Sequence, residues 1–297
     1  MDSKKLNRPD FLVIGGMKCA STTMHEDLSM HPMIECGKKE LNALLKTDLA
    51  EIAAIYSNNF RGAQTEQLLG DVSADYSTLP TNPGVAERAL KVAPGLKIVY
   101  IVRDPVRRAL SHHKHMVNWS GEGRMPQDVN VAIENHPELM SYSCYAMQLQ
   151  PWIKAFGLEN ILVIKFEDYV SDRTVVTNRV CRFLSLPETE LELSEAGANR
   201  GESRRYAGKF VYNLYRSKFF RNVVQPAAPD FLRKALRQVL LRKNRQVEIP
   251  PTRATLEQIA DGVKTDGEKL QVLLKLNEPL WNVEQTIEKV LLKEKGN

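Results

Sequence analysis

Short apolar runs alternate with longer segments of helical spacing along the first two thirds of the chain. The runs cover residues 11–14, 96–102 and 160–165, and a weaker one covers residues 33–36. Uninterrupted runs of this length are typical of strands that are buried on both faces of a parallel sheet. The segments that follow them, such as residues 171–184, have the apolar period of amphipathic helices. The pattern predicts an α/β fold whose central, mainly parallel sheet is covered on both faces by helices.

The pattern changes after residue 188, where no further strand is predicted. Amphipathic helices, two of them basic, are expected at residues 210–224, at residues 231–244 and, as a last pair, after Pro250-Pro251. Because there is no internal repeat, we expect one domain, with an α/β core over about residues 8–190 and a helical C-terminal portion over about residues 200–297.

The composition is that of an ordinary globular protein. The 297 residues are 43% apolar, which is enough for a sizeable core, and 26% charged, which excludes a disordered chain. The net charge of +5 does not by itself indicate nucleic acid, and no nucleic-acid partner is expected. Lysine and arginine crowd residues 200–245, which favours either an anionic ligand or a solvated helical face.

The spacing of the cysteines and the lengths of the apolar runs indicate the cellular compartment. Cys19, Cys36, Cys144 and Cys181 have neither zinc-site nor disulfide-framework spacing, so we expect free thiols in a reducing environment and no bound metal. The apolar runs are too short for a signal peptide or a membrane span. The sequence therefore predicts a cytoplasmic protein, and it leaves the oligomeric state open.

A glycine pair ends the first strand and leads towards Lys18 and a helix. Such a turn exposes backbone N–H groups at the positive end of a helix dipole, an arrangement that binds phosphate. Lys18 adds a charge, and Ser21 and Thr22, which can cap the helix, add hydroxyl donors. A nucleotide-triphosphate loop needs a hydroxyl directly after its lysine to hold magnesium, whereas Cys19 occupies that position. The alternative is a turn that only joins a strand to a helix.

A second phosphate-type segment follows the run at residues 96–102. Arg103 opens Arg-Asp-Pro, and Ser111 lies eight residues later, two turns into the next helix. The carboxyl ends of parallel strands carry the active-site groups of such sheets, and arginine can grip a phosphate with two nitrogens. The alternative is that Arg103 only pairs with a neighbouring group. Because the Lys18 turn and the Arg103 segment occur in order, each after a strand, the sequence favours one phosphate-binding site that both segments share.

The two segments resemble motifs of the sulfotransferases that use 3′-phosphoadenosine-5′-phosphosulfate (PAPS). The Lys18 segment resembles their 5′-phosphosulfate loop, Gly-x-x-Lys-x-Gly-[Ser/Thr]-[Ser/Thr]. The Arg103 segment resembles their 3′-phosphate motif, Arg-[Asn/Asp]-Pro with a serine eight residues after the arginine. The carbohydrate (heparan-sulfate-type) and bacterial members are the most similar. The resemblance implies a P-loop-like three-layer sandwich. It assigns cofactor binding to Lys18, Ala20, Ser21, Thr22, Thr23, Arg103 and Ser111. Ala20 departs from the family, which usually has glycine there.

The resemblance continues along almost the whole chain. Residues 70–76 look like the family's Gly-Glu-x-[Ser/Thr]-Pro-x-Tyr stretch, and residues 145–168 and 182–187 match apolar core positions. The basic loop at residues 199–205 sits where family members fold a loop over the nucleotide, which implies roles for Ser203 and Arg204. A solvated loop is the alternative there.

Glu40 is the candidate general base. A Lys-Glu-x-x-Phe-Phe segment supplies this base in the carbohydrate-type enzymes, and Lys39-Glu40 lies at the same distance from the loop lysine. Lys18 would neutralise the departing phosphate and Lys39 would orient the transferring group. The aromatics that follow this glutamate in the family are missing, which loosens the analogy for the acceptor site. The alternative for Glu40 is a surface pair with Lys38 or Lys39.

Histidine serves as the base in cytosolic sulfotransferases, so His112, His113 and His115 are weaker candidates. Side chains at adjacent positions of one helix cannot all face one site. The sequence therefore predicts a metal-independent sulfotransferase that binds PAPS, and its product 3′-phosphoadenosine-5′-phosphate (PAP), and acts on a carbohydrate or another small molecule. A small-molecule kinase or nucleotide hydrolase is the alternative enzyme. A non-catalytic module that binds a nucleotide or anion is the third possibility, and nothing identifies the acceptor or decides between O- and N-sulfation.

Overall fold

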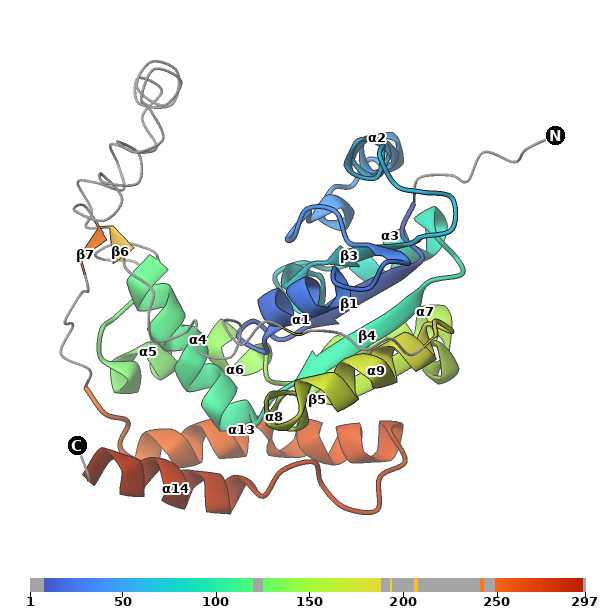
Figure 1. Cartoon of the computed structure of the whole chain (residues 1–297). Helices are drawn as coiled ribbons and strands as arrows, with labels where there is room; N and C mark the ends of the chain where they lie inside the picture. The colour runs from blue at the N-terminus through green and yellow to red at the C-terminus, as the bar shows by residue number, and fades with distance from the viewer. Residues whose placement is uncertain are drawn as a thin grey trace, which may run out of the picture.

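The structure is a computed structural model that describes residues 8–119, 125–187, 193, 206–207, 241–242 and 249–295 (Figure 1). Its strands are β1 (Phe11–Gly15), β2 (Ile34–Glu35), β3 (Leu68–Val72), β4 (Lys97–Val102), β5 (Ile161–Lys165), β6 (Tyr206–Ala207) and β7 (Leu241–Arg242). Its α-helices are α1 (Ser21–Leu28), α2 (Leu49–Asn59), α3 (Val85–Val92), α4 (Pro105–Trp119), α5 (Val129–Asn135), α6 (Glu138–Ser141), α7 (Tyr145–Phe156), α8 (Phe166–Ser171), α9 (Arg173–Phe183), α13 (Arg253–Leu273) and α14 (Val283–Lys295). Short 3₁₀ turns form η1 (Ala43–Leu45), η2 (Ala74–Ser77) and η3 (Leu158–Asn160).

The five strands β1 to β5 form the central sheet of the described residues, in the order β2-β3-β1-β4-β5. Every neighbouring pair is parallel, and β1 is central, with Phe11 aligned to Gly70 on one side and to Lys97 on the other. The strand expected at residues 33–36 is β2, and those expected from the three apolar runs are β1, β4 and β5. The predicted α/β fold with a mainly parallel sheet is confirmed.

Alternate side chains of β1 bury themselves on opposite faces of the sheet. Leu12 and Ile14 belong to a core shared with α2, α3 and α7, whereas Phe11 and Val13 belong to a core shared with α1 and α9. All four side chains are at most 1% exposed. Figure 1 shows α1 and α9 on the near face of the sheet and α3 on the far one. This is the three-layer arrangement that the resemblance implied.

A third core holds the C-terminal helices against the rest of the chain. Val106 and Ala109 of α4 pack with Leu256 and Ile259 of α13 and with Ile287 of α14. In Figure 1 the two helices, coloured orange and red, lie together along one side of the molecule. They are the helix pair that was expected after Pro250-Pro251.

Three expectations about the elements were wrong. Strand β3 was missed because Gly70 and Asp71 interrupt its apolar pattern. The prediction of no strand after residue 188 fails because β6 and β7 pair in an antiparallel ladder, which is too short to leave a periodic pattern. The helix expected over residues 231–244 is wrong at residues 241–242, which form β7. The helix expected over about residues 171–184 is confirmed as α9, which begins where the Asp172 side chain accepts a hydrogen bond from the N–H of Val175. The rest of the basic helices expected at 210–224 and 231–244 lies outside the described residues.

Candidate functional site

Three turns meet at the carboxyl edge of the sheet, after the central strand β1 and after its two neighbours β3 and β4. Because neighbouring strands are about 4.8 Å apart, the segments that leave them lie side by side. The turn after β1 carries Lys18, the segment after β4 begins at Arg103, and the segment after β3 supports Glu40. The structure therefore brings the residues expected to bind phosphate and the residue expected to act as the base to one edge of the sheet.

The Lys18 turn is shaped by left-handed backbone. Lys18 has φ 75° and Ala20 has φ 65°, on either side of Cys19. Such a change of hand turns successive N–H groups inwards into an anion-binding concavity. Gly15 is required before it, since an added Cβ would lie 2.3 Å from the Ile101 carbonyl oxygen. The turn therefore has the geometry of a phosphate cradle that opens onto the N-terminus of α1.

The helix cap differs from the expectation. Ala20 is the N-cap of α1, and no side chain caps the helix. Ser21 and Thr22, expected to cap it, lie inside its first turn together with Thr23, and all three are half-buried. Their backbone N–H groups belong to the end of the helix that attracts anions.

Arg103 is bound to the Lys18 turn. Its Nη1 donates to the Lys18 carbonyl oxygen at 2.9 Å, and its guanidinium carbon lies 4.4 Å from the centre of the Phe166 ring. The Nε atom is buried and has no partner in the described part of the chain. Burial lowers the pKa of this guanidinium, which nevertheless keeps its charge because arginine does not lose its proton in proteins. A buried cation with unsatisfied N–H groups fits a phosphate ligand.

The backbone of Arg103 is held by residues that the sequence did not single out. The Tyr145 hydroxyl donates to the Arg103 carbonyl oxygen at 2.7 Å and accepts from the Arg103 N–H at 3.1 Å. Glu167 accepts from the Asp104 N–H at 2.9 Å and from the indole N–H of Trp281 at 3.0 Å. These partners come from three distant segments, and no local pattern links them.

Ser111 and the candidate histidines lie on α4, which starts next to Arg103. Ser111 is half-buried. His112 is 2% exposed and stacks on Tyr142 with the ring centres 5.6 Å apart. Burial lowers its pKa to about 3, with a smaller effect from the Arg108 charge, so it is a very weak base. His113 is also buried, with its Nε2 2.8 Å from the Pro126 carbonyl oxygen.

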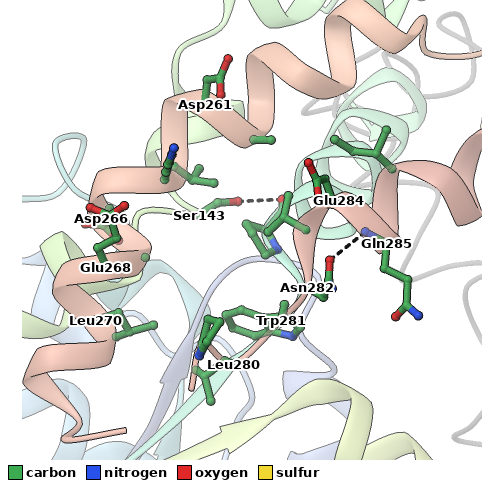
Figure 2. A pocket seen from close by; sticks show the side chains of 18 of the residues that line it. Ser143, Asp261, Asp266, Glu268, Leu270, Leu280, Trp281, Asn282, Glu284 and Gln285 are labelled. Carbon is green, nitrogen blue, oxygen red and sulfur yellow. Dashed lines mark hydrogen bonds between the residues drawn. The ribbon is translucent and has the colours of Figure 1, made fainter. Parts of the chain in front are cut away.

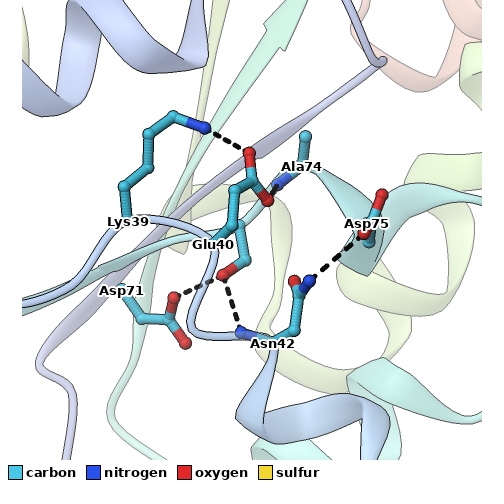
Figure 3. A network of polar contacts seen from close by, with 7 residues as sticks. Lys39, Glu40, Asn42, Asp71, Ala74 and Asp75 are labelled. Atoms are coloured by element: carbon cyan, nitrogen blue, oxygen red, sulfur yellow. Dashed lines mark hydrogen bonds and ion pairs between the residues drawn. The ribbon is translucent and has the colours of Figure 1, made fainter. Parts of the chain in front are cut away.

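Glu40 sits in a second left-handed turn, shown in Figure 3. Its φ is 54°, and its N–H donates to the Val72 carbonyl oxygen at the end of β3. The carboxylate accepts from the Ala74 N–H at 3.1 Å and pairs with Lys39 Nζ. The alternative expected from the sequence, a pair with a neighbouring lysine, thus describes one of its two contacts. The other contact, together with the 36% exposure of the side chain, leaves the carboxylate oriented and accessible.

The buried carboxylate of Asp71 holds the Glu40 turn in place through a network of hydrogen bonds. Asp71 is 1% exposed and accepts hydrogen bonds from the hydroxyls of Tyr56 (2.8 Å), Tyr76 (2.6 Å) and Ser73 (2.6 Å). Ser73 Oγ in turn accepts from the Asn42 N–H at 3.2 Å (Figure 3). Burial raises the pKa of Asp71, and the three hydroxyl donors oppose that effect. The segment at residues 73–77 also reaches the first turn, because the Gly15 N–H donates to Ser77 Oγ.

Backbone strain is concentrated in these two turns. Within the described residues six non-glycine residues have positive φ, and four of them are Lys18, Ala20, Glu40 and Asn42. Each such residue costs of order 1 kcal/mol and persists only where the surrounding contacts determine it. The strain thus marks the edge that the motifs had indicated.

The remaining expectations concern a nucleotide-covering loop, metal sites and membrane spans. Ser203 and Arg204 are outside the described residues. No group of three His, Cys, Asp or Glu side chains that could hold a metal occurs in the described ranges. None of the helices described is long and apolar enough to cross a membrane.

A cavity of about 1050 Å³ lies between α13 and α14 (Figure 2). Its walls include Leu270 and Trp281, and the acidic side chains of Asp261 and Glu284. No residue of the Lys18 or Glu40 turns lines it, whereas Pro105 and Tyr145, which adjoin the Arg103 segment, do.

Comparison with known proteins agrees with the motifs. Residues 45–190 match the sulfotransferase family, a range that includes Arg103 and Ser111 and begins after Lys18 and Glu40. The chain is 25% identical over 203 residues to a bifunctional heparan sulfate N-deacetylase/N-sulfotransferase of Caenorhabditis elegans, covering 63% of this chain and 23% of the relative. It is 21% identical over 189 residues to heparan sulfate glucosamine 3-O-sulfotransferase 5 of Mus musculus, covering 60% of this chain and 54% of the relative. The chain thus matches about a quarter of the first of these relatives and about half of the second.

Among solved structures, a sulfotransferase from Alicyclobacillus acidocaldarius has the same fold. The TM-score is 0.61 at 21% identity, and the likeness covers 91% of this chain and 97% of that one.

Proposed function

Because this chain belongs to the superfamily of PAPS-dependent sulfotransferases, we propose that it transfers a sulfuryl group from PAPS to a hydroxyl or amine of a saccharide or other small molecule. The observation that carries the proposal is the contact between the two phosphate-type segments. The Arg103 guanidinium bonds to the Lys18 carbonyl oxygen and keeps a buried, unpartnered Nε. Two anion-binding elements at one edge suit a nucleotide with phosphates on both its 3′ and 5′ oxygens.

The residues of this edge would hold such a nucleotide at both ends. The Lys18 turn and the first turn of α1, with Ser21, Thr22 and Thr23, present N–H and hydroxyl donors for the 5′-phosphosulfate. Arg103 and Ser111 would bind the 3′-phosphate. Ser203 and Arg204 stay proposed contacts on the basis of the family resemblance alone.

The transfer itself needs a base and a charge near the leaving group. The acceptor oxygen or nitrogen bonds to sulfur while the bond from sulfur to the bridging oxygen breaks, and PAP leaves with that electron pair. Glu40 would take the acceptor proton, because its carboxylate is held by the Ala74 N–H beside the Lys18 turn. Lys18 would neutralise the oxygen that departs, and Lys39 would position Glu40 and the transferring group.

Binding of PAP tests the nucleotide assignment. By calorimetry, Lys18→Ala and Arg103→Ala should each weaken the affinity at least about tenfold, since each removes a charge-assisted contact to a phosphate. Arg107→Ala is the matched control, because this arginine is exposed on α4 and should leave the affinity close to that of the wild type. Unchanged affinity in both site variants would overturn the assignment. Magnesium-dependent loss of ATP would instead favour a nucleotide hydrolase.

Turnover of Glu40→Gln tests the base. The variant should keep its affinity for PAP and lose roughly 10²–10⁴-fold in turnover, the usual contribution of a general base. Normal turnover would move the role to a histidine of α4, of which His115 is half-buried whereas His112 and His113 are buried.

The acceptor is proposed from the names of the relatives, which act on heparan sulfate. A screen with labelled donor should compare saccharides that offer hydroxyls with saccharides that offer a free amine. Label transfer to neither class would exclude a saccharide acceptor and leave other hydroxylated small molecules.

A further inference from the structure

A second buried arginine lies directly under the Lys18 turn. Arg108 of α4 is 0% exposed, which makes it one of the largest fully buried side chains of the structure. A Cβ added at Gly16 would lie 2.9 Å from Arg108 Cδ and 3.3 Å from Cys19 Sγ. The arginine stem is therefore packed against the floor of the turn, with no room between them.

The hydrogen-bond partners of Arg108 are all neutral. Its Nε donates to Ser143 Oγ at 2.5 Å, its Nη2 donates to the Leu139 carbonyl oxygen, and its Nη1 lies 3.4 Å from Nδ1 of His112. His112 is neutral at physiological pH, since burial lowers its pKa to about 3. Across the described ranges, no carboxylate lies within ion-pair distance of this guanidinium. Among the residues that the structure describes, a full positive charge is thus buried without a counter-charge.

The surroundings of the turn add to this charge. Arg103 and Arg108 both lie within electrostatic reach of the buried Cys19, and Lys18 lies within reach of His112. Burial raises the pKa of Cys19 to about 12, so its thiol supplies no negative charge. Glu167 is a carboxylate within electrostatic reach of Arg103 and Cys19, and its oxygens accept hydrogen bonds from the Asp104 N–H and from Trp281. Its charge offsets part of the Arg103 charge, and it is not among the groups that act most strongly on Arg108.

Burying an unpaired charge is strongly unfavourable, and an arginine cannot avoid this cost by losing its proton. A fold that keeps such a charge beneath an anion-binding turn gains from it when an anion arrives. The interaction crosses a low-dielectric interior, where charges attract over longer distances than in water.

We propose that Arg108 is a positioning residue for the 5′-phosphosulfate, a buried counter-charge that acts through the Gly16 turn and does not touch the ligand. The inference rests on the proposed function, and it assigns to the ligand the negative charge that the described residues do not supply to Arg108. It is specific to the 5′ end of the nucleotide, because Arg108 packs under the turn after β1.

The test compares PAP with adenosine 3′-phosphate, which lacks the 5′-phosphate. The ratio of the two dissociation constants measures what the 5′-phosphate contributes to affinity. In Arg108→Gln, which is neutral but still offers N–H donors, this ratio should fall roughly tenfold relative to the wild type. In Arg108→Lys, which keeps the charge and loses the planar fork, the ratio should stay within about threefold of the wild type. Arg173→Gln is the matched control, since Arg173 has a carboxylate partner in Asp27 and its ratio should not change.

A purely structural role for Arg108 predicts a different result. It would weaken both ligands equally in both variants and leave the ratio unchanged, and that outcome would overturn the inference. If Arg108→Gln does not fold, the ratio in Arg108→Lys still tests the inference. A ratio about tenfold below that of the wild type in Arg108→Lys would also overturn it, because the positive charge alone would then not suffice. Failure of the wild type to bind PAP would instead overturn the proposed function.

Discussion

Ala20 is held in a conformation that alanine disfavours. Its φ of 65° and ψ of 25° are left-handed, and it caps α1 without a side-chain hydrogen bond. The family motif usually has glycine at this position, which adopts such angles without steric cost. The residue keeps its N–H for an anion, so the departure from the motif affects stability more than it affects the donor set.

Replacing Ala20 with glycine should therefore stabilise the protein. We expect Ala20→Gly to raise the free energy of unfolding by about 1 kcal/mol, because the left-handed strain is removed. Urea unfolding measures the change. Ala54→Gly, on an exposed position inside α2, is the control and should destabilise by about 1 kcal/mol, the usual helix penalty of glycine. A loss of stability in Ala20→Gly similar to the control would show that the turn is not strained.

His112 makes the stability of the fold depend on pH. Its folded-state pKa of about 3 lies below the ordinary value of 6.5, so between these values the unfolded chain binds a proton that the folded chain does not. The free energy of unfolding should therefore fall as the pH falls from about 6.5 towards about 3, with a contribution of at most about 1.4 kcal/mol per pH unit. His112→Phe keeps the ring stacked on Tyr142 and should make this slope shallower in urea titrations at several pH values. An identical slope in the variant would mean that another group causes the dependence.

At the scale of elements, α7 begins on a carboxylate from a helix far along the chain. Cys144 is the N-cap of α7 and provides no side-chain cap. Asp266, inside α13, accepts instead from the N–H groups of Ala146 and Met147, both at 2.8 Å. One side chain thus satisfies two free N–H groups of α7 and ties α13 to the core.

Removing this carboxylate should loosen the attachment of α13. We expect Asp266→Ala to lower the free energy of unfolding by about 1–2 kcal/mol, the range for loss of a helix cap. Asp261→Ala removes an exposed carboxylate of the same helix that has no contact of this kind and should change stability by less than about 0.5 kcal/mol. Equal effects of the two substitutions would contradict the capping role.

The sequence predicts the elements whose signals are local and misses those fixed by distant partners. Strands β1, β4 and β5 follow from continuous apolar runs, and Lys18 and Arg103 follow from their place at strand ends. Strand β3 carries a buried Asp71 that is stabilised by hydroxyls from outside the strand, so its own residues do not read as apolar. The pair of Glu40 with Lys39 follows from the sequence as the alternative expected for this residue, whereas its contact with the Ala74 N–H depends on where η2 lies, which the pattern does not show.

The whole molecule is linked by polar contacts from the C-terminal helices to the Arg103 segment. Thr286 of α14 donates to Asp104 Oδ2 at 2.6 Å, and Trp281 donates to Glu167, which also holds the Asp104 N–H. The ring of Trp281 lies 5.7 Å from that of Tyr145. Because these bonds join the helical C-terminal portion to the edge of the sheet, we expect the two parts to depend on each other for stability.

This dependence predicts one cooperative unfolding transition. Trp152 lies within the core around α7, whereas Trp281, in the segment between α13 and α14, packs against that core from outside and so reports on the docking of the C-terminal helices. Two variants, each keeping one of these tryptophans and carrying phenylalanine at the other two tryptophan positions, should show the same urea midpoint by fluorescence, and the same midpoint by far-ultraviolet circular dichroism. The reason is that α13 and α14 bury apolar side chains against α4 and cap α7, contacts that neither part can keep alone. A Trp281 signal that changes at lower urea than the Trp152 signal would show that the C-terminal helices detach as a separate unit. In that case PAP, for which we propose a site at the sheet edge, should shift the Trp152 midpoint alone.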